Sequence, residues 1–169
     1  MSMQFTVTDH GDLKRLTQKF ELLRHNALHA KPAMQRILAD MRLVEKEVFG
    51  EQGARGGNKR WRRLKPGTVE RKGSVEILRT YNAKPRYSSI GQDALYRSLV
   101  VGNAKYRVAR ATNFSAEFGT TRPYAIVHQT GSRSRNIPAR PFLQFTSQDE
   151  ERWVTTIEAW LIHGFGNER

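Results

Sequence analysis

The chain has 169 residues, of which 38% are hydrophobic and 27% charged, with a formal net charge of +13 and no cysteine. This length is typical of one domain with its own core, and the absence of cysteine excludes disulfides, thiolate catalysis and cysteine-ligated zinc. The positive charge predicts a subunit that is drawn to an acidic partner, either nucleic acid or an acidic protein surface.

The first fifty residues predict a short strand and two helices. Residues 3–7 alternate apolar and polar side chains, which is typical of a half-buried strand. Asp9 or Asp12 suits the N-cap of a first helix. After a break, Pro32 suits the first turn of a second helix that Gly50 would end. The apolar face of the first helix is Leu13, Leu16, Phe20 and Leu23, and that of the second is Met34, Ile37, Met41, Val44 and Val48.

Residues 51–72 predict a long, mobile, basic loop, because four glycines and eight basic residues stand against only two glutamates. Trp61 and Leu64 are its expected anchors. Two interpretations of Trp61 stay open. It stacks a nucleic-acid base while the neighbouring arginines hold phosphates, or it fills a core or subunit contact while the charges are solvated.

The middle of the chain predicts short elements. Thr68 suits the cap of a short helix, and residues 82–91 form a second loose stretch. A short helix or turn follows at Ala94, Leu95 and Leu99. Strands are predicted at residues 99–101, 106–111 and 116–118.

The last third begins with a short predicted helix over residues 124–129, which starts after Pro123 and stops at Gly131. Residues 131–136 form another basic loop, and residues 140–145 predict a strand. A capping box at Ser147 and Glu150 opens a final helix. Its apolar side is Trp153, Ile157, Trp160 and Leu161, with Gly164 just past its end.

Together these elements predict an α+β fold, with helices on one face of a small, mostly antiparallel sheet and with long basic loops. We expect a single domain over residues 1–169. It has an N-terminal helical part at about 9–50, the extended basic loop at about 51–72, and a sheet-and-helix part at about 94–164.

Candidate chemistry is sparse. His25 and His29 have a spacing that can hold a metal, but no glutamate follows His25 in the zinc-protease pattern, so we expect surface histidines. His128 lacks nearby carboxylates, because Glu117 is the only acidic residue between positions 105 and 148, and a structural role is favoured. The glycines at 53, 56 and 57 lack the ending of a phosphate-binding loop. We therefore expect no catalytic residue, no metal, no cofactor and no enzyme.

Membrane insertion and secretion are not expected either. No apolar run approaches the ~18 residues of a membrane span, and the first residues lack the pattern of a secretory signal.

Four segments together resemble the phage virion morphogenesis family, the tail-completion proteins of P2-like and Mu-like phages. The four segments are Trp61-Arg62-Arg63-Leu64 with Thr68 and Lys72; Ile77-Leu78 with residues 91–95 and Ser98; Val101-Gly102 with Tyr124-Ala125-Ile126-Val127-His128-Gln129-Thr130-Gly131; and Ile137-Pro138-Ala139-Arg140-Pro141-Phe142-Leu143. The last two are the most specific. The resemblance covers the chain from about residue 50 onward, and residues 80–89 carry an insert where the family turns tightly.

The motifs also have a physical interpretation. Pro138 and Pro141 cannot donate backbone hydrogen bonds and so restrict their segment to a sheet edge or a strand entry. Arg140 between them has a restricted direction that suits a carboxylate or a backbone carbonyl. Such residues position loops. The predicted scaffold is Trp61, Leu64, Thr68, Tyr124, His128, Gln129, Gly131, Pro138, Arg140, Pro141 and Phe142.

The resemblance implies a structural virion protein of the neck or tail, made in the host cytoplasm, that forms a ring at the head–tail junction as a tail-completion, terminator or neck subunit. The ring is expected to be a hexamer closed by heterologous contacts. Its partners are other copies of itself, connector or adaptor proteins, and tail-tube or terminator proteins, with residual charge that touches genomic DNA.

The two basic loops are the expected contact arms. Their contact residues are Arg55, Lys59, Arg60, Trp61, Arg62, Arg63, Lys65, Arg133 and Arg135. The main alternative is a non-specific DNA-binding protein that uses these loops. A small metal-dependent nuclease is a weaker alternative, which would lose activity on substitution of His128.

Overall fold

The computed structural model describes residues 10–72, 77–78, 95–101 and 105–164. Its elements are α1 (His10–Leu28), α2 (Lys31–Gly50), the 3-10 turn η1 (Arg55–Gly57), α3 (Pro66–Lys72), α5 (Leu95–Val100), β1 (Arg107–Ala111), β2 (Ala116–Thr120), α6 (Ala125–Thr130) and α7 (Ser147–His163). Strands β1 and β2 form an antiparallel sheet that packs against helices, so the predicted α+β class is confirmed. None of the described helices combines the length and hydrophobicity needed to span a bilayer.

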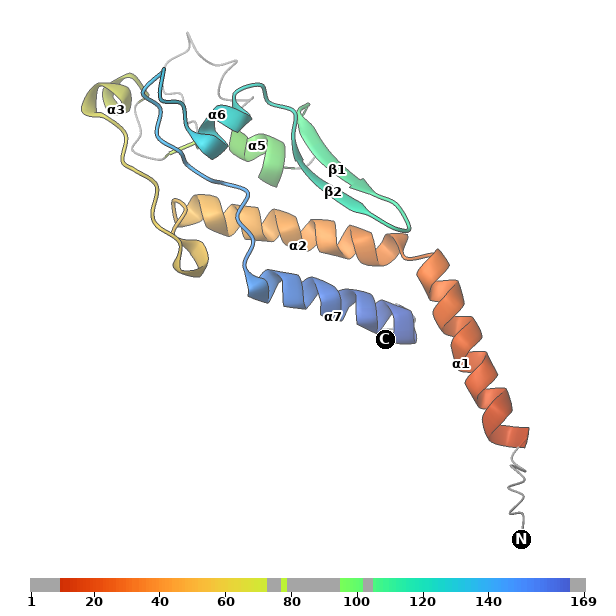
Figure 1. Ribbon diagram of the computed structural model, residues 1–169. Coiled ribbons are helices and arrows are strands. Elements are labelled where there is room, and N and C mark those ends of the chain that lie inside the picture. The colour runs from red at the N-terminus through yellow and green to blue at the C-terminus, as the bar shows by residue number, and fades with distance from the viewer. Residues whose placement is uncertain (1–9, 73–76, 79–94, 102–104, 165–169) are drawn as a thin grey trace.

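Helix α2 is the central element. The sheet and α5 pack on one side of it and α7 on the other, while α1 projects away from the body (Figure 1). Side chains from α2, α5, α6 and three segments outside the helices meet in one core, which is Val44, Val48, Phe49, Trp61, Ile77, Leu95, Leu99, Val100, Ala125 and Phe142. Phe49 lies at its middle, with its ring edge-to-face against Trp61 at 5.5 Å and against Tyr96 at 5.4 Å.

The start of α7 is fixed by a buried ion network. Thr146 is the N-cap: its side chain accepts from the backbone N–H of Asp149, whose carboxylate accepts from the Thr146 backbone in return. The predicted capping box at Ser147 and Glu150 was therefore one residue too late. The fully buried Asp149 also receives two bonds from the Arg55 guanidinium, at 2.6 and 2.8 Å. The segment that follows α2 is thereby fastened to α7.

Several predicted elements are confirmed. The break between the first two helices lies at residues 29–30, with Pro32 in the first turn of α2. Strand β1 and strand β2 occupy the two later predicted strand positions, and α6 ends at Gly131 as predicted. The final helix ends at His163, with Gly164 just past its end as predicted.

Three predictions of whole segments were wrong. Residues 99–101 do not form a strand, since Leu99 and Val100 are the buried end of α5. Residues 140–145 are extended but pair with no strand in the described part, because their backbone is bound by a side chain instead. Residues 51–72 are not one continuous loop, since they contain η1 and α3. The predicted strand at residues 3–7, the loose stretch at 82–91 and the insert at 80–89 lie outside the described residues.

Candidate assembly surface

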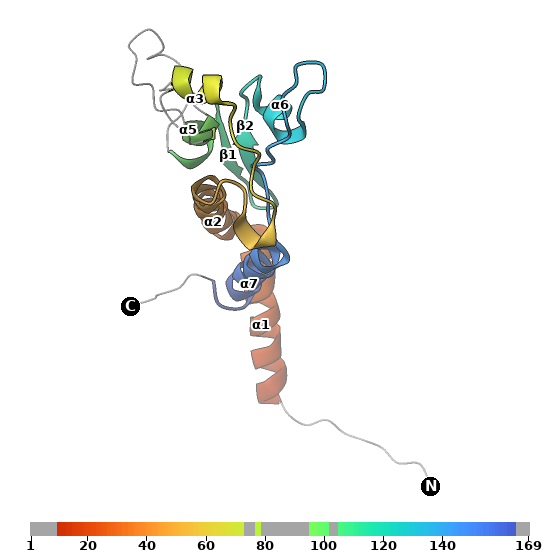
Figure 2. The ribbon, with the colours of Figure 1, turned by 90° about the vertical axis from the view of Figure 1, so that its left-hand side faces the viewer.

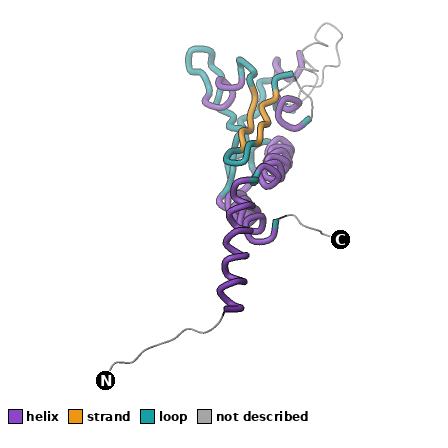
Figure 3. The backbone as a smooth tube through the Cα atoms, turned by 90° about the vertical axis from the view of Figure 1, so that its right-hand side faces the viewer, coloured by secondary structure: helices purple, strands orange, loops and turns teal. Residues whose placement is uncertain are grey.

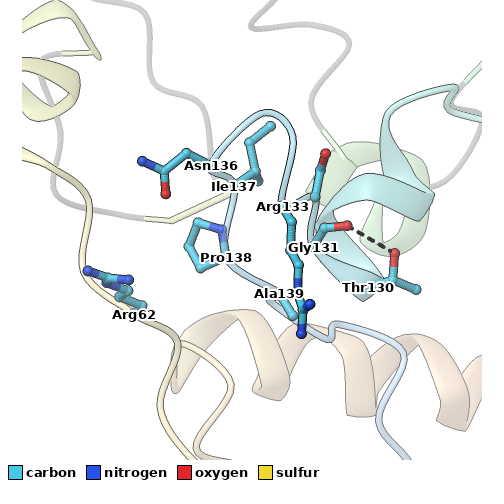
Figure 4. A pocket seen from close by; sticks show the side chains of 9 residues that line it. Arg62, Thr130, Gly131, Arg133, Asn136, Ile137, Pro138 and Ala139 are labelled. Atoms are coloured by element: carbon cyan, nitrogen blue, oxygen red, sulfur yellow. Dashed lines mark hydrogen bonds between the residues drawn. The ribbon is translucent and has the colours of Figure 1, made fainter.

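The two basic segments, which are some 70 residues apart in sequence, line one cleft of about 410 Å³. Arg62 stands on one side of this basic cleft, and the loop that carries Arg133 forms the other side (Figure 4). The cleft is lined by Arg62, Thr130, Gly131, Ser132, Arg133, Asn136, Ile137, Pro138 and Ala139. The two predicted arms therefore form one surface. Figure 2 places this loop beside the sheet, at the end of the molecule opposite α1.

The first segment is held by Trp61. Its ring is buried in the core, and its indole N–H donates to the Pro141 carbonyl at 2.7 Å. Its backbone N–H donates to the Gln52 carbonyl, also at 2.7 Å. Gly53 has a φ of +86°, and a Cβ there would lie 2.3 Å from the indole nitrogen of Trp61. Trp61 thus fills the core, as one of its two interpretations predicted, and the buried ring leaves no face on which a base could stack.

The second segment is held by the end of α6. Gly131 has a φ of +79°, and a Cβ there would lie 2.8 Å from the backbone nitrogen of Ala139. Ser132 and Ile137 then exchange two backbone hydrogen bonds, at 2.8 and 2.9 Å, which close the loop. Arg133 and Arg135 lie at its exposed tip.

Gln129 explains why the two most specific motifs occur together. Its side-chain carbonyl accepts from the backbone N–H groups of Phe142 and Leu143, at 3.0 and 3.2 Å. The backbone N–H of Arg140 donates to the His128 carbonyl at 2.7 Å. One motif therefore binds the backbone of the other and directs Phe142 into the core. Sequence analysis identified both motifs as scaffold but not their pairing; the available signal was an amide side chain at a helix end followed by an extended, proline-flanked segment.

Arg140 is a buried cation without a carboxylate partner in the described part of the chain. Its residue is 7% exposed, and its guanidinium donates to the Arg62 carbonyl at 3.4 Å, one of the two acceptor types predicted for it. Its Nε is buried with no described acceptor. Burial, and secondarily the charge of Arg62, lower the pKa of Arg140 below its ordinary value. Arg140 thus adds a buried positive charge next to the exposed Arg62.

The expected contact residues fall into two groups. Arg55 and Trp61 belong to the interior, since Arg55 is paired with Asp149 and Glu47 and Trp61 is in the core. The other seven side chains are exposed, and none makes an ion pair with another residue that the structure describes. These seven are Lys59, Arg60, Arg62, Arg63, Lys65, Arg133 and Arg135.

The remaining predicted scaffold residues have lesser roles. Leu64 is partly buried against the core, and Thr68 lies inside α3 instead of capping it. Tyr124 directly precedes α6 and contacts the ring of His128 edge-to-face at 5.7 Å. His128 is half-buried. The rings of His25 and His29 stack at 4.3 Å, and no group of three or more metal-ligating side chains occurs among the described residues.

Known proteins resemble the chain over most of its length. A model described as the phage virion morphogenesis family matches residues 11–162. The chain is 28% identical over 156 residues to Mu-like prophage FluMu G protein 2 of Haemophilus influenzae, an alignment that covers 89% of this chain and 92% of that protein. No solved structure matches the chain.

Proposed function

Because this chain belongs to the phage virion morphogenesis family, we propose that it is a structural subunit of a ring that completes the head–tail junction of a tailed bacteriophage. The observation that supports this role is the basic cleft, whose two arginines make no ion pair with any residue that the structure describes and lie on a hydrogen-bonded scaffold. The scaffold residues are those through which the sequence resembles the family. Such a surface is suited to docking, because its shape is fixed before the partner arrives.

The chemistry of the cleft favours binding over catalysis. Its nine lining residues include two arginines and two hydroxyl side chains, but no carboxylate and no histidine that would act as a base. The guanidinium group of arginine binds a carboxylate through two parallel hydrogen bonds. The proposed partner is therefore an acidic surface, on a connector or adaptor protein, a tail-tube or terminator protein, or a neighbouring subunit.

Charge also bears on when the ring forms. A net charge of +13 on 169 residues makes free subunits repel one another. In this proposal an acidic template neutralises part of the charge, and the subunits then close a ring, which we propose is a hexamer, through heterologous contacts.

Imaging of particles assembled without this protein tests the proposal. We expect filled heads and separate tails, which wild-type protein joins. The double variant Arg62→Glu with Arg133→Glu should fail to join them, whereas Lys46→Glu, a reversal of an exposed charge on α2 away from the cleft, should succeed. Normal joined particles in the absence of the protein would refute the proposal.

A non-specific DNA-binding function is the second candidate, and the seven exposed Lys and Arg side chains of the two basic segments favour it. It predicts binding of free duplex DNA whose affinity falls steeply with salt, by roughly 0.9 log units per neutralised phosphate for each tenfold rise in salt. Joined particles with altered DNA content, together with such a salt slope, would favour this function over the ring.

A further inference from the structure

Helix α1 carries an apolar stripe that the rest of the described chain does not cover. Leu13, Leu16 and Phe20 recur at helical spacing and are 54%, 49% and 61% exposed. The face was predicted from the sequence, but no described element packs over it. Figures 1 and 3 show why: α1 extends away from the body, and along most of its length no other helix or strand of the described chain lies beside it.

Only the C-terminal end of α1 is fastened to the body. The Asn26 amide donates to the carbonyls of Trp160 and Leu161 at 3.1 and 3.0 Å, and the Trp160 indole donates to the Asn26 carbonyl at 2.7 Å. These bonds hold the end of α1 against the end of α7. Since α1 is one continuous helix, its N-terminal half extends away from this contact (Figure 1).

An uncovered stripe of this kind needs a partner. In proteins, a helix gains most of its stability from the packing of its apolar face and less from the intrinsic helix propensity of its residues. Exposed contiguous apolar side chains on a folded protein mark interaction sites.

The outer face of α7 has the complementary character. Val154, Glu158 and Ile162 are spaced four residues apart and so lie on one face, where Val154 and Ile162 are 53% and 55% exposed. In a chain of net charge +13, α7 is acidic, with four carboxylate residues and one arginine. Helix α1 has the opposite balance, with four Lys or Arg residues and two acidic ones.

The positions of the charges fit a contact between these faces. On α1, Lys19 follows Leu16 by three residues and Arg24 follows Phe20 by four, so both stand beside the stripe, where Arg24 also pairs with Glu21 at 3.2 Å. On α7, Glu158 lies between the two exposed apolar side chains. An apolar stripe bordered by cations thus matches an apolar face bearing a carboxylate.

We propose that the α1 stripe of one copy docks on the outer face of α7 in a second copy. The contact is heterologous, because stripe and acceptor are different surfaces. Each copy therefore keeps one free stripe and one free acceptor, and repetition of the contact closes a ring. The inference rests on the proposed ring and identifies the helices through which its subunits join.

The test uses the absence of cysteine from the chain. Leu16→Cys and Val154→Cys are placed in separate copies, the two variants are co-expressed during particle assembly, and joined particles are treated with a short bis-maleimide linker. We expect a cross-linked dimer that contains one copy of each variant and that neither variant gives alone. With both cysteines in every copy, the linker should produce a ladder of bands that stops at the ring size.

A matched pair of substitutions tests the stripe itself. Leu16→Glu should weaken the contact by about tenfold or more, since it removes one buried leucine side chain from the interface. Leu22→Glu makes the same change on the opposite side of α1, where the leucine is 45% exposed, and should leave cross-linking intact. Equal loss of cross-linking in the two variants would contradict the proposal.

Other outcomes overturn the inference in distinguishable ways. Cross-linking of Leu16→Cys to itself would assign α1 to a symmetric pair of α1 helices. Flotation of the protein with anionic vesicles, lost in Leu16→Glu but kept in Leu22→Glu, would assign the stripe to a membrane surface. Joined particles that contain the protein without an α1–α7 cross-link would refute this contact and leave the proposed function standing. Particles that lack the protein would refute the proposed function.

Discussion

Arg55 and Arg62 are seven residues apart on one basic segment, yet the structure uses them in opposite ways. Arg55 is largely buried and bonded to two carboxylates, those of Asp149 and Glu47. Arg62 is exposed, lines the basic cleft and makes no ion pair with a described residue. The first charge is satisfied within the subunit, whereas the second is available to a partner.

Composition alone cannot separate these two roles. Both residues lie in a run that is rich in arginine and lysine, and the carboxylates that satisfy Arg55 come from α2 and from α7, which starts ninety residues later. The difference teaches that the location of the acidic residues in the fold decides which cations are structural and which are free. The charge density along the chain gives only the total number of cations and does not separate the two kinds.

The largest expected effect on stability comes from removing the paired charge of Arg55. Arg55→Ala should lower the free energy of unfolding by about 3–5 kcal/mol, because it leaves Asp149 buried without its cation. Urea unfolding followed by circular dichroism measures this change. Arg62→Ala is the matched control and should stay within about 0.5 kcal/mol of wild type. Equal effects of the two substitutions would remove the distinction between the residues.

The buried carboxyl groups of Glu45 and Asp149 show the same contrast between an unpaired and a paired group. It is fully buried on α2 with no described hydrogen-bond partner, and burial raises its pKa to about 9, against a smaller opposing effect of the Arg55 charge. Arg55 instead holds the pKa of Asp149 well below its ordinary range. Of the two buried carboxyls, one is therefore neutral at pH 7 and the other is charged.

This difference predicts a pH dependence. The folded state holds the Glu45 proton up to pH of about 9, while the unfolded chain releases it near 4.5. The contribution of Glu45 to stability should therefore be fully present below pH 4.5 and fall between the two values, by about 1.4 kcal/mol per pH unit, or about 3 kcal/mol from pH 6 to 8. Glu45→Gln should flatten this slope in thermal or urea unfolding. An unchanged slope would show that Glu45 is not its source.

Much of the fold could be predicted from the sequence, because local patterns specify it. The spacing of apolar residues gave α2 and α7, Pro32 marked a helix start, and Gly131 and Gly164 marked two ends. Residues 140–145 could not be assigned correctly from local pattern. Their strand-like composition is satisfied by the side chain of Gln129 from a distant element, which no nearby residue indicates.

The candidate site was predicted residue by residue but not as an arrangement. Both basic segments and their anchor Trp61 were identified, yet as two separate arms. Their meeting depends on the bond from Trp61 to Pro141 and on that from Arg140 to Arg62, each of which spans about eighty residues. Such long-range contacts leave no periodic signal in a single sequence.

Arg140 gives the smallest expected effect and the sharpest contrast with Arg55. Both guanidiniums are shielded from solvent, but Arg140 has only the Arg62 carbonyl as a described partner and stands close to a second positive charge. Its burial is therefore uncompensated, and Arg140→Met, which keeps the length of the side chain, should leave stability unchanged or raise it by about 1 kcal/mol. Urea unfolding at pH 7 measures this change, with Arg140→Lys as the variant that keeps the charge.

A loss of more than about 1 kcal/mol on Arg140→Met would mean that the guanidinium is as much a part of the fold as that of Arg55. The expected result, a stable fold without it, would mean that folding does not require this charge. The same variant can then be assayed for joining of heads to tails. If the stable Arg140→Met variant fails to join heads to tails, the buried Arg140 also contributes to the charged surface formed by the exposed arginines of the cleft.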